Sequence, residues 1–269
     1  MSTQYQIQQK YFESFACDLS EKRALVTGCA SGIGKSISEY LVMCGAEVIC
    51  CDLNPISLNI PDERKSLVST QKVDLTNTQE LIAFAQDLRD IDILINNAGL
   101  QFVSPIEDFP IDMWDTIMAV MLRAPFILIK HTIRGMYEKQ WGRIINIASV
   151  HGLVASPFKS AYVSAKHGLI GLTKTVALEA AQRCGNLTVN AICPSYVRTP
   201  LVENQIASQA KLHNLPENEV ISKVLLEANA IKKLIEPEQV AVVVGFLCQE
   251  SSWPITGSTI NLDAGWLAH

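Results

Sequence analysis

The chain has 269 residues, of which 48% are hydrophobic and 18% are charged. This composition excludes a disordered chain and a collagen-like repeat, and the length suits one large α/β domain or two smaller ones. The formal net charge of -5 argues against a general nucleic-acid-binding protein, because such proteins carry a basic surface for the phosphate groups.

The eight cysteines form no Cys-x-x-Cys pair and no Cys/His cluster with zinc spacing, so the sequence predicts no metal site. Most of them stand in apolar runs, which favours buried, reduced thiols and a cytoplasmic location. Residues 1–20 lack the apolar segment of a signal peptide, and we interpret them as an extension of a single domain over residues 21–269. The most apolar stretch, residues 117–129, is interrupted by Arg123 and Pro125, so we expect no membrane-spanning helix.

From Lys22 onward, apolar runs of strand length alternate with amphipathic stretches of helix length. In chain order, strands are expected over residues 24–26, 47–52, 71–74, 91–96, 143–149, 187–193 and 259–262. Helices are expected over residues 33–44, 76–88, 111–137, 160–182 and 237–248. Parallel strands need such helical crossovers, so the predicted fold class is α/β: a doubly wound, mostly seven-stranded parallel sheet of the Rossmann type.

The alternation is interrupted between residues 195 and 236, which are polar and only partly helical in pattern. This segment follows a predicted strand at its carboxyl end, where α/β folds place elements that gate a ligand. We interpret residues 195–236 as a helical lid over the substrate site. A purely structural helical excursion is the alternative.

A glycine-rich turn follows the first predicted strand and opens the first helix, with the sequence Thr-Gly-Cys-Ala-Ser-Gly-Ile-Gly over residues 27–34. Glycines allow a sharp turn and a close approach of the backbone to a pyrophosphate, whose charge meets the helix N-terminus. The spacing is G-x3-G-x-G rather than the commoner G-x-G-x-x-G. Asp52 ends the second strand, where a carboxylate accepts hydrogen bonds from ribose hydroxyls and repels a 2′-phosphate. The sequence therefore predicts NAD as the cofactor rather than NADP.

Tyr162 and Lys166 are four residues apart on a predicted helix and share one face of it. A tyrosine has an ordinary pKa of about 10, and a neighbouring ammonium can lower that pKa towards the range of a general base. Ser149 ends the preceding strand at the carboxyl edge of the sheet, where its hydroxyl can polarise a substrate oxygen. We predict Ser149, Tyr162 and Lys166 as the catalytic residues.

Jointly these motifs resemble the short-chain dehydrogenase/reductase family over residues 22–266. The resemblance also includes Asp74-Leu75, Asn96-Asn97-Ala98-Gly99, and Pro194 followed by Thr199-Pro200. It implies an oxidoreductase that forms a homotetramer built on the long helices. From the composition we expect a cytoplasmic protein with no nucleic-acid or membrane partner. The predicted cofactor-binding residues are Gly28, Ser31, Gly32, Ile33, Gly34, Asp52, Asp74, Leu75, Asn96, Ala98, Gly99, Tyr162, Lys166, Pro194, Val197 and Thr199.

Further residues resemble the branch of this family that acts on D-3-hydroxybutyrate. By that resemblance the substrate-binding residues are Gln101, His151, Lys159, Tyr196, Gln205 and Trp266, with Tyr196 at a position where the branch carries Trp. The chemistry of these residues agrees, because Lys159 supplies a charge and the two glutamines and the histidine supply directional donors for a buried carboxylate. The predicted substrate is therefore a small hydroxy or keto acid.

We expect reversible oxidation of (R)-3-hydroxybutyrate to acetoacetate with NAD⁺, in which Tyr162 takes the hydroxyl proton. A 3-oxoacyl carrier-protein reductase is one alternative, although it should need NADP, which Asp52 disfavours. A regulator that binds NAD without catalysis is a second alternative, suggested by Met121. The family usually carries Asn at this position, as the anchor of a water that joins the lysine to bulk solvent, and a thioether is only a weak acceptor.

Overall fold

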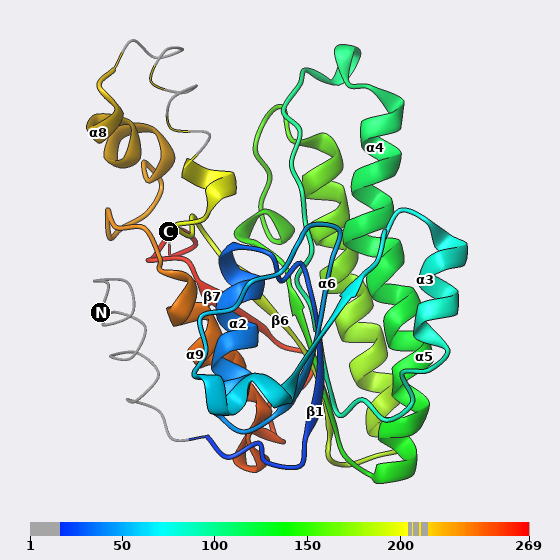
Figure 1. Cartoon of the computed structure of the whole chain (residues 1–269). Coiled ribbons are helices and arrows are strands. Elements are labelled where there is room, and N and C mark those ends of the chain that lie inside the picture. Colours follow the sequence, from blue (N-terminus) through cyan, green and yellow to red (C-terminus); the bar gives the residue numbers. More distant parts are fainter. Residues whose placement is uncertain (1–16, 204–205, 207–209, 211–214, 269) are drawn as a thin grey trace.

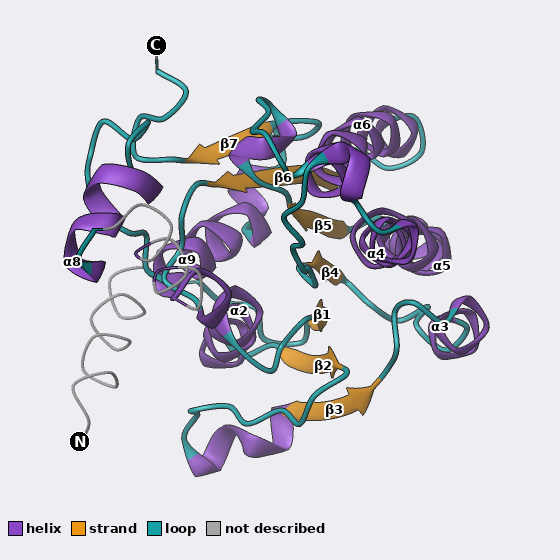
Figure 2. Cartoon of the chain, turned by 90° about the horizontal axis from the view of Figure 1, so that it is seen from above, coloured by secondary structure: helices purple, strands orange, loops and turns teal. Residues whose placement is uncertain are grey.

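The structure is a computed structural model that describes residues 17–203, 206, 210 and 215–268 (Figure 1). Its strands form one parallel sheet in the order β3-β2-β1-β4-β5-β6-β7 (Figure 2). The strands are β1 (Arg23–Thr27), β2 (Glu47–Asp52), β3 (Val68–Lys72), β4 (Ile93–Asn96), β5 (Gly142–Ile147), β6 (Leu187–Pro194) and β7 (Thr259–Leu262). The predicted seven-stranded, doubly wound parallel sheet is confirmed.

Helices cover both faces of this sheet. The α-helices are α2 (Gly32–Met43), α3 (Thr78–Ala85), α4 (Ile111–Met118), α5 (Ala124–Lys139), α6 (Ser160–Ala181), α8 (Glu217–Val220) and α9 (Pro237–Cys248). Helices α2 and α9 lie on one side, and α3, α5 and α6 lie on the other (Figure 2). Neighbouring strand residues serve opposite faces, since Val26 packs in the core under α2 and α9 and Leu25 packs in the core under α3, α5 and α6.

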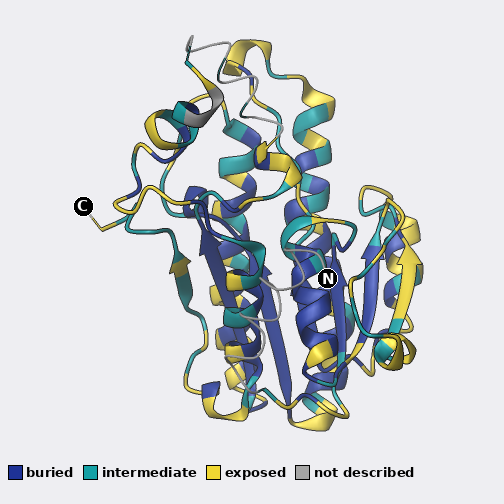
Figure 3. Ribbon diagram, turned by 60° about the vertical axis from the view of Figure 1, so that its left-hand side comes forward, coloured by how far each residue is buried: buried dark blue, intermediate teal, exposed yellow. Residues whose placement is uncertain are grey.

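The central strands are buried along their whole length, and Figure 3 shows them as the buried centre of the molecule. Burial on both faces explains why their sequences are near-continuous apolar runs. The edge strand β3 differs, because four of its five side chains are exposed. The exposed side chains of this edge strand show no hydrophobic periodicity. The predicted range, residues 71–74, therefore begins later than the observed strand.

The long helix expected over residues 111–137 is interrupted by one wide turn. A π-helical turn, η3 (Ala119–Arg123), joins α4 to α5 without a break in the chain direction. Pro125 has no N–H to donate to the Met121 carbonyl, and its ring crowds that oxygen, so the backbone widens before the proline. Met121 lies in this turn and is 1% exposed.

In the described part of the chain, the segment Ile111–Lys139 is long and apolar enough to cross a membrane, but half of its apolar window is buried inside the structure. A core helix passes the same test of length and composition. Most of the extension expected at residues 1–20 lies outside the described residues. Within the expected lid, Val202, Val220, Leu226 and Leu234 pack into a small apolar cluster of their own beside Tyr196.

Candidate active site

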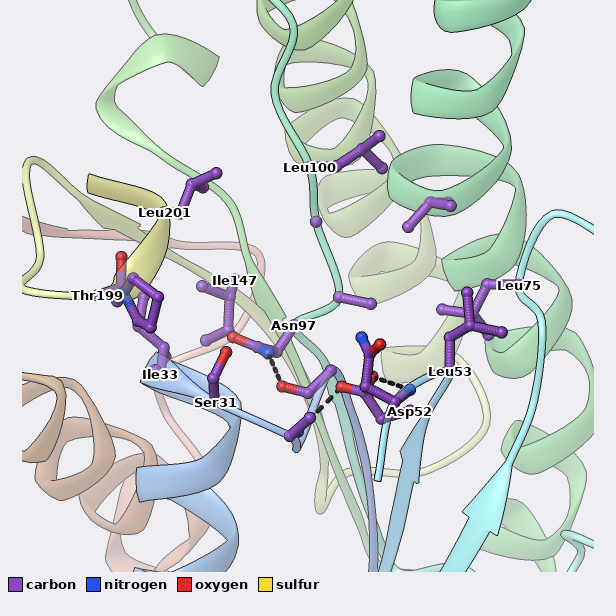
Figure 4. A pocket seen from close by; sticks show the side chains of 18 of the residues that line it. Ser31, Ile33, Asp52, Leu53, Leu75, Asn97, Leu100, Ile147, Thr199 and Leu201 are labelled. Atoms are coloured by element: carbon purple, nitrogen blue, oxygen red, sulfur yellow. Dashed lines mark hydrogen bonds between the residues drawn. The ribbon is translucent and has the colours of Figure 1, made fainter. Parts of the chain in front are cut away.

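A cavity of about 500 Å³ opens at the carboxyl ends of the strands on both sides of β1, which is the usual ligand position of such sheets (Figure 4). Most predicted cofactor and catalytic residues line it. They are Gly28, Ser31, Gly32, Ile33, Asp52, Asp74, Leu75, Ala98, Gly99, Ser149, Tyr162, Lys166, Pro194, Val197 and Thr199.

The glycine-rich turn is held against the loop after β4. Asn97 Nδ2 donates to the carbonyl oxygens of Thr27 at 2.9 Å and of Gly28 at 3.1 Å (Figure 4). Thr27 Oγ1 accepts in return from the backbone N–H groups of Asn97 and Ala98, at 3.0 and 3.1 Å. Gly28 has a φ of 74°, which glycine adopts without strain. Asn97 is thus a functional residue that the sequence prediction omitted, although it belongs to the same Asn-Asn-Ala-Gly motif.

Asn96 is not among the residues that line the cavity, and its contact with the cofactor stays a prediction. It is 3% exposed, and its Nδ2 donates to Asn146 Oδ1 at 2.8 Å. Asn146 Nδ2 donates in turn to Thr173 Oγ1 at 2.8 Å. Asn96 belongs to β4, and its side chain takes part in a polar chain that ties β4 and β5 to α6. Gly34 does not line the cavity either. It packs closely against the Gly28 carbonyl and the Asn97 side chain.

Asp52 stands at the end of β2 with its carboxylate at the cavity wall. It accepts hydrogen bonds from Ala30 N at 2.9 Å and from Asn54 N at 2.8 Å (Figure 4). Among the described residues of the cavity wall, Lys166 is the only cation. A carboxylate that is held in place and has no arginine or lysine beside it fits the two hydroxyls of an adenosine ribose better than a 2′-phosphate. The residues present therefore fit a dinucleotide.

The three predicted catalytic residues meet at one end of the cavity. Ser149 and Lys166 are 6% and 4% exposed, and Lys166 Nζ donates to the Ile147 carbonyl at 2.6 Å. Lys166 Nζ also lies 5.7 Å from the centroid of the Tyr162 ring. Ser149 Oγ accepts from His151 N at 3.1 Å, which fixes the hydroxyl beside the tyrosine.

The sequence predicts that Lys166 lowers the pKa of Tyr162, but the surroundings of Tyr162 in the fold raise this pKa. Burial raises the pKa of Tyr162 above its ordinary value, and a hydrogen bond with the Ser149 hydroxyl opposes this rise only in part. The sequence could not show how deeply the pair is buried. Burial also lowers the pKa of Lys166 to about 8, because the apolar surroundings disfavour the ammonium.

A set of aromatic side chains borders the tyrosine on the substrate side. The His151 ring lies 6.1 Å from the Tyr162 ring and 5.5 Å from the Trp266 ring, between centroids. Trp266 stacks on Tyr196 at 5.8 Å with an interplanar angle of 27°. Lys159 Nζ lies 5.7 Å from the centroid of Tyr196. The fold thus gathers four predicted substrate residues beside Tyr162 from distant parts of the chain.

The polar groups of this region are suited to an anion. Gln101 Nε2 is buried and donates to no group of the described chain. Burial lowers the pKa of Lys159, so a negative partner would be favoured there. Burial and the Lys159 charge lower the pKa of His151 to about 4, so the ring is neutral at pH 7, and its Nε2 lies 2.7 Å from Ser156 Oγ. Gln205 lies outside the described residues.

Met121 packs in an apolar cluster with Ala161, Ala165 and Tyr162. Its Sδ and Cε atoms also approach the Cα side of Gly99, at 3.9 and 3.8 Å from where a Cβ would stand. The side chain therefore adds apolar contacts behind the tyrosine, and it offers no strong hydrogen bond to a water there.

Comparison with known proteins agrees with this geometry. Residues 22–210 match the family described as short chain dehydrogenase. A D-beta-hydroxybutyrate dehydrogenase of Rhizobium meliloti is 46% identical over 92% of this chain and 99% of its own length. The enzyme of the same name from Cupriavidus necator is 40% identical over 93% and 99%. A 3-oxoacyl-[acyl-carrier-protein] reductase of Rickettsia prowazekii is 32% identical over 93% and 98%.

Solved structures show the same fold. A putative 2-deoxy-D-gluconate 3-dehydrogenase of Agrobacterium tumefaciens, solved with bound NADP, has a TM-score of 0.79 and 30% identity over 94% of this chain and 98% of its own. A putative NAD(P)-dependent gluconate 5-dehydrogenase of Beutenbergia cavernae has a TM-score of 0.82 and 26% identity, over 95% and 100%. Motifs, fold and relatives agree: the chain belongs to the short-chain dehydrogenase/reductase family of oxidoreductases, which use NAD(P).

Proposed function

We propose that the protein interconverts (R)-3-hydroxybutyrate and acetoacetate with NAD⁺. The observation that carries the proposal is the half-buried Lys159 ammonium beside Tyr196 and His151, together with a buried Gln101 amide that has no partner in the described chain. A buried donor without a partner is costly, by about 1–3 kcal/mol, and a substrate carboxylate removes that cost. The two relatives named for D-beta-hydroxybutyrate support this choice of substrate.

The chain's own residues manage the proton of the alcohol. A dinucleotide bound in the cavity would supply the acceptor for the hydride from C3 of the hydroxy acid. Tyr162 Oη accepts the hydroxyl proton, and Ser149 donates a hydrogen bond to the substrate oxygen. Lys166 is 4% exposed, and its ammonium stabilises the phenolate form of Tyr162, which burial alone disfavours.

We propose NAD rather than NADP because of Asp52. Its carboxylate is held by the Ala30 and Asn54 backbone donors and faces the part of the cavity that an adenosine ribose would occupy. A 2′-phosphate placed there would meet this charge, and Lys166, the only cation among the described wall residues, stands with the catalytic residues instead. Two solved structures of relatives contain NADP, so the preference of this chain for NAD⁺ over NADP⁺ has to be measured directly.

We also propose a cytoplasmic homotetramer with no nucleic-acid or membrane partner and a single domain over residues 21–269. Two exposed apolar side chains on the outer helices, Phe126 on α5 and Leu178 on α6, support association with a second copy. A hollow lined by Met118, Leu122 and Leu172 adjoins Phe126. Light scattering should give four times the chain mass, and Phe126→Glu should lower it.

The first test is the formation of NADH with (R)- and with (S)-3-hydroxybutyrate, each with NAD⁺ and with NADP⁺. Signal with the (R) acid and NAD⁺ alone supports cofactor, substrate and stereochemistry together. A preference for NADPH and a 3-oxoacyl thioester would instead favour the carrier-protein reductase. NAD binding without turnover of any alcohol would favour a regulator.

Lys159→Ala tests the carboxylate site. A hydrogen bond to a charged group contributes about 1.5–3 kcal/mol, so KM for the hydroxy acid should rise by about 10- to 100-fold. KM for NAD⁺ should change far less. Lys174→Ala, the same change on an exposed residue of α6, is the matched control and should leave both values unchanged. Equal increases in both KM values for Lys159→Ala would refute the assignment.

A further inference from the structure

One buried amide joins the two segments that carry the aromatic pair of the substrate site. Asn229 is 1% exposed and lies between α8 and α9. Its Nδ2 donates to Ser195 Oγ at 3.0 Å and to the Asp263 carbonyl at 2.6 Å. Ser195 directly precedes Tyr196 after β6, and Asp263 begins the turn after β7 that carries Trp266. Both amide hydrogens are therefore used to hold these two segments together.

Other contacts keep the turn after β7 in a fixed shape. The Asp263 carboxylate accepts from Gly265 N and from Leu267 N, both at 3.0 Å. Ile231 N, two residues beyond Asn229, donates to the Ala264 carbonyl at 3.0 Å, so the two segments lie against each other. A Cβ on Gly265 would stand 2.7 Å from Ala230 Cβ, so the contact admits no side chain there. Trp266 thus belongs to a turn that is hydrogen-bonded and closely packed against the segment of Asn229.

The aromatic pair depends on this link for its geometry. Trp266 stacks on Tyr196 at 5.8 Å and meets His151 edge-on at 5.5 Å. The two rings come from the two segments that Asn229 joins, and Tyr196 borders Lys159. A small rotation of the turn after β7, which does not line the dinucleotide cavity, would open or close the site on the substrate side.

We propose that Asn229 is a positioning residue for the substrate, which sets the Trp266–Tyr196 stack through Ser195 and the Asp263 turn. The inference rests on the proposed function for the identity of the substrate. Among the described residues, Asn229 is hydrogen-bonded neither to Tyr162 nor to a predicted cofactor-binding residue, and its one hydrogen bond to the cavity wall is to the Ser195 hydroxyl. It should therefore govern the KM of the hydroxy acid and leave hydride transfer and NAD⁺ binding nearly unchanged.

The test compares Asn229→Ala with Asn190→Ala. Asn190 is also 1% exposed, and its amide also joins β6 to the chain before β7, through Ile255 O at 2.6 Å and Ser258 N at 3.1 Å. Asn229→Ala should raise KM for (R)-3-hydroxybutyrate by about tenfold, with kcat and KM for NAD⁺ within about threefold of the parent. It should also remove the near-ultraviolet circular dichroism of the stacked pair, and Trp266→Phe should have the same effect. Asn190→Ala should alter neither KM nor this signal.

Ser195→Ala removes only one acceptor of the Asn229 amide. It is the test variant to use if Asn229→Ala does not fold. It should give a smaller rise in KM and a weakened dichroism signal. Parental KM and dichroism in both variants would overturn the proposal, as would an equal rise in KM for Asn190→Ala. If the parent protein does not turn over hydroxybutyrate, the proposed function fails, while the dichroism comparison still decides whether Asn229 sets the stack.

Discussion

A single methyl group at Gly34 should separate the two loops that form the dinucleotide cavity. A Cβ at this position would lie 2.1 Å from the Gly28 carbonyl oxygen and 2.4 Å from Asn97 Nδ2. Gly28 O would have to retreat by about 1 Å to reach the shortest contact that a Cβ makes, which costs about 1–3 kcal/mol. The same movement strains the Asn97 hydrogen bonds, each of which contributes about 0.5–1.5 kcal/mol.

Gly34→Ala should therefore lower the free energy of unfolding by about 2–5 kcal/mol, which is about 5–15 °C in Tm for a chain of this size. Kd for NAD⁺ should rise at least about tenfold, because the turn that approaches the pyrophosphate is displaced. Thermal melts and calorimetric titration measure the two effects. Gly185→Ala is the control, since nothing lies within 4 Å of a Cβ there. A parental Tm and Kd for Gly34→Ala, or equal losses in the control, would refute this reasoning.

Three further changes test the site. The folded-state pKa of Lys166 is about 8 and its ordinary value is 10.5, so the unfolded chain binds more protons than the folded chain between these pH values. In urea unfolding, the free energy of unfolding of the parent should therefore rise by about 3 kcal/mol relative to that of Lys166→Met from pH 8 to 10.5. The absence of such a rise would contradict the burial of the ammonium. Asp52→Asn keeps an acceptor for Ala30 N and removes the charge. In steady-state kinetics, kcat/KM for NADP⁺ divided by kcat/KM for NAD⁺ should therefore rise about 10-fold or more. An unchanged ratio would mean that Asp52 does not determine the cofactor preference. Met121→Asn should raise kcat by up to about tenfold if the proton path from Lys166 limits turnover, and an unchanged kcat and pH profile would remove that idea.

The sequence predicted the parts of the fold that repeat a local pattern. The glycine-rich turn, Asp52 at the end of β2, and the Tyr162–Lys166 pair each follow from spacing along one strand or helix, and the structure places all of them at one cavity. Strand β3 was displaced in the prediction because its exposed side chains carry no hydrophobic period. The motif contains both Asn96 and Asn97, and only the geometry shows that the Asn97 side chain holds the turn while the Asn96 side chain is bonded to Asn146.

Features that depend on contacts between distant segments left no signal in the sequence. Asn229 is an isolated polar residue in a segment without a regular pattern, and its partners Ser195 and Asp263 are 34 residues away on either side. The raised pKa of Tyr162 likewise depends on burial by several elements at once, which residue spacing cannot show. The unpartnered Gln101 amide became visible only when its surroundings were in place.

The position of β1 has a consequence for how the chain folds during synthesis. β1 pairs with β2, which follows it closely, but its other edge pairs with β4, where Ala24 faces Ile93. At 5–20 residues per second, that partner emerges about 3–14 s after β1. During this interval an open strand edge carries Leu25 and Val26, which are both fully buried in the finished protein. We expect the nascent chain to be most prone to aggregation in this interval, and conditions that slow translation through residues 50–95 should lower the soluble yield.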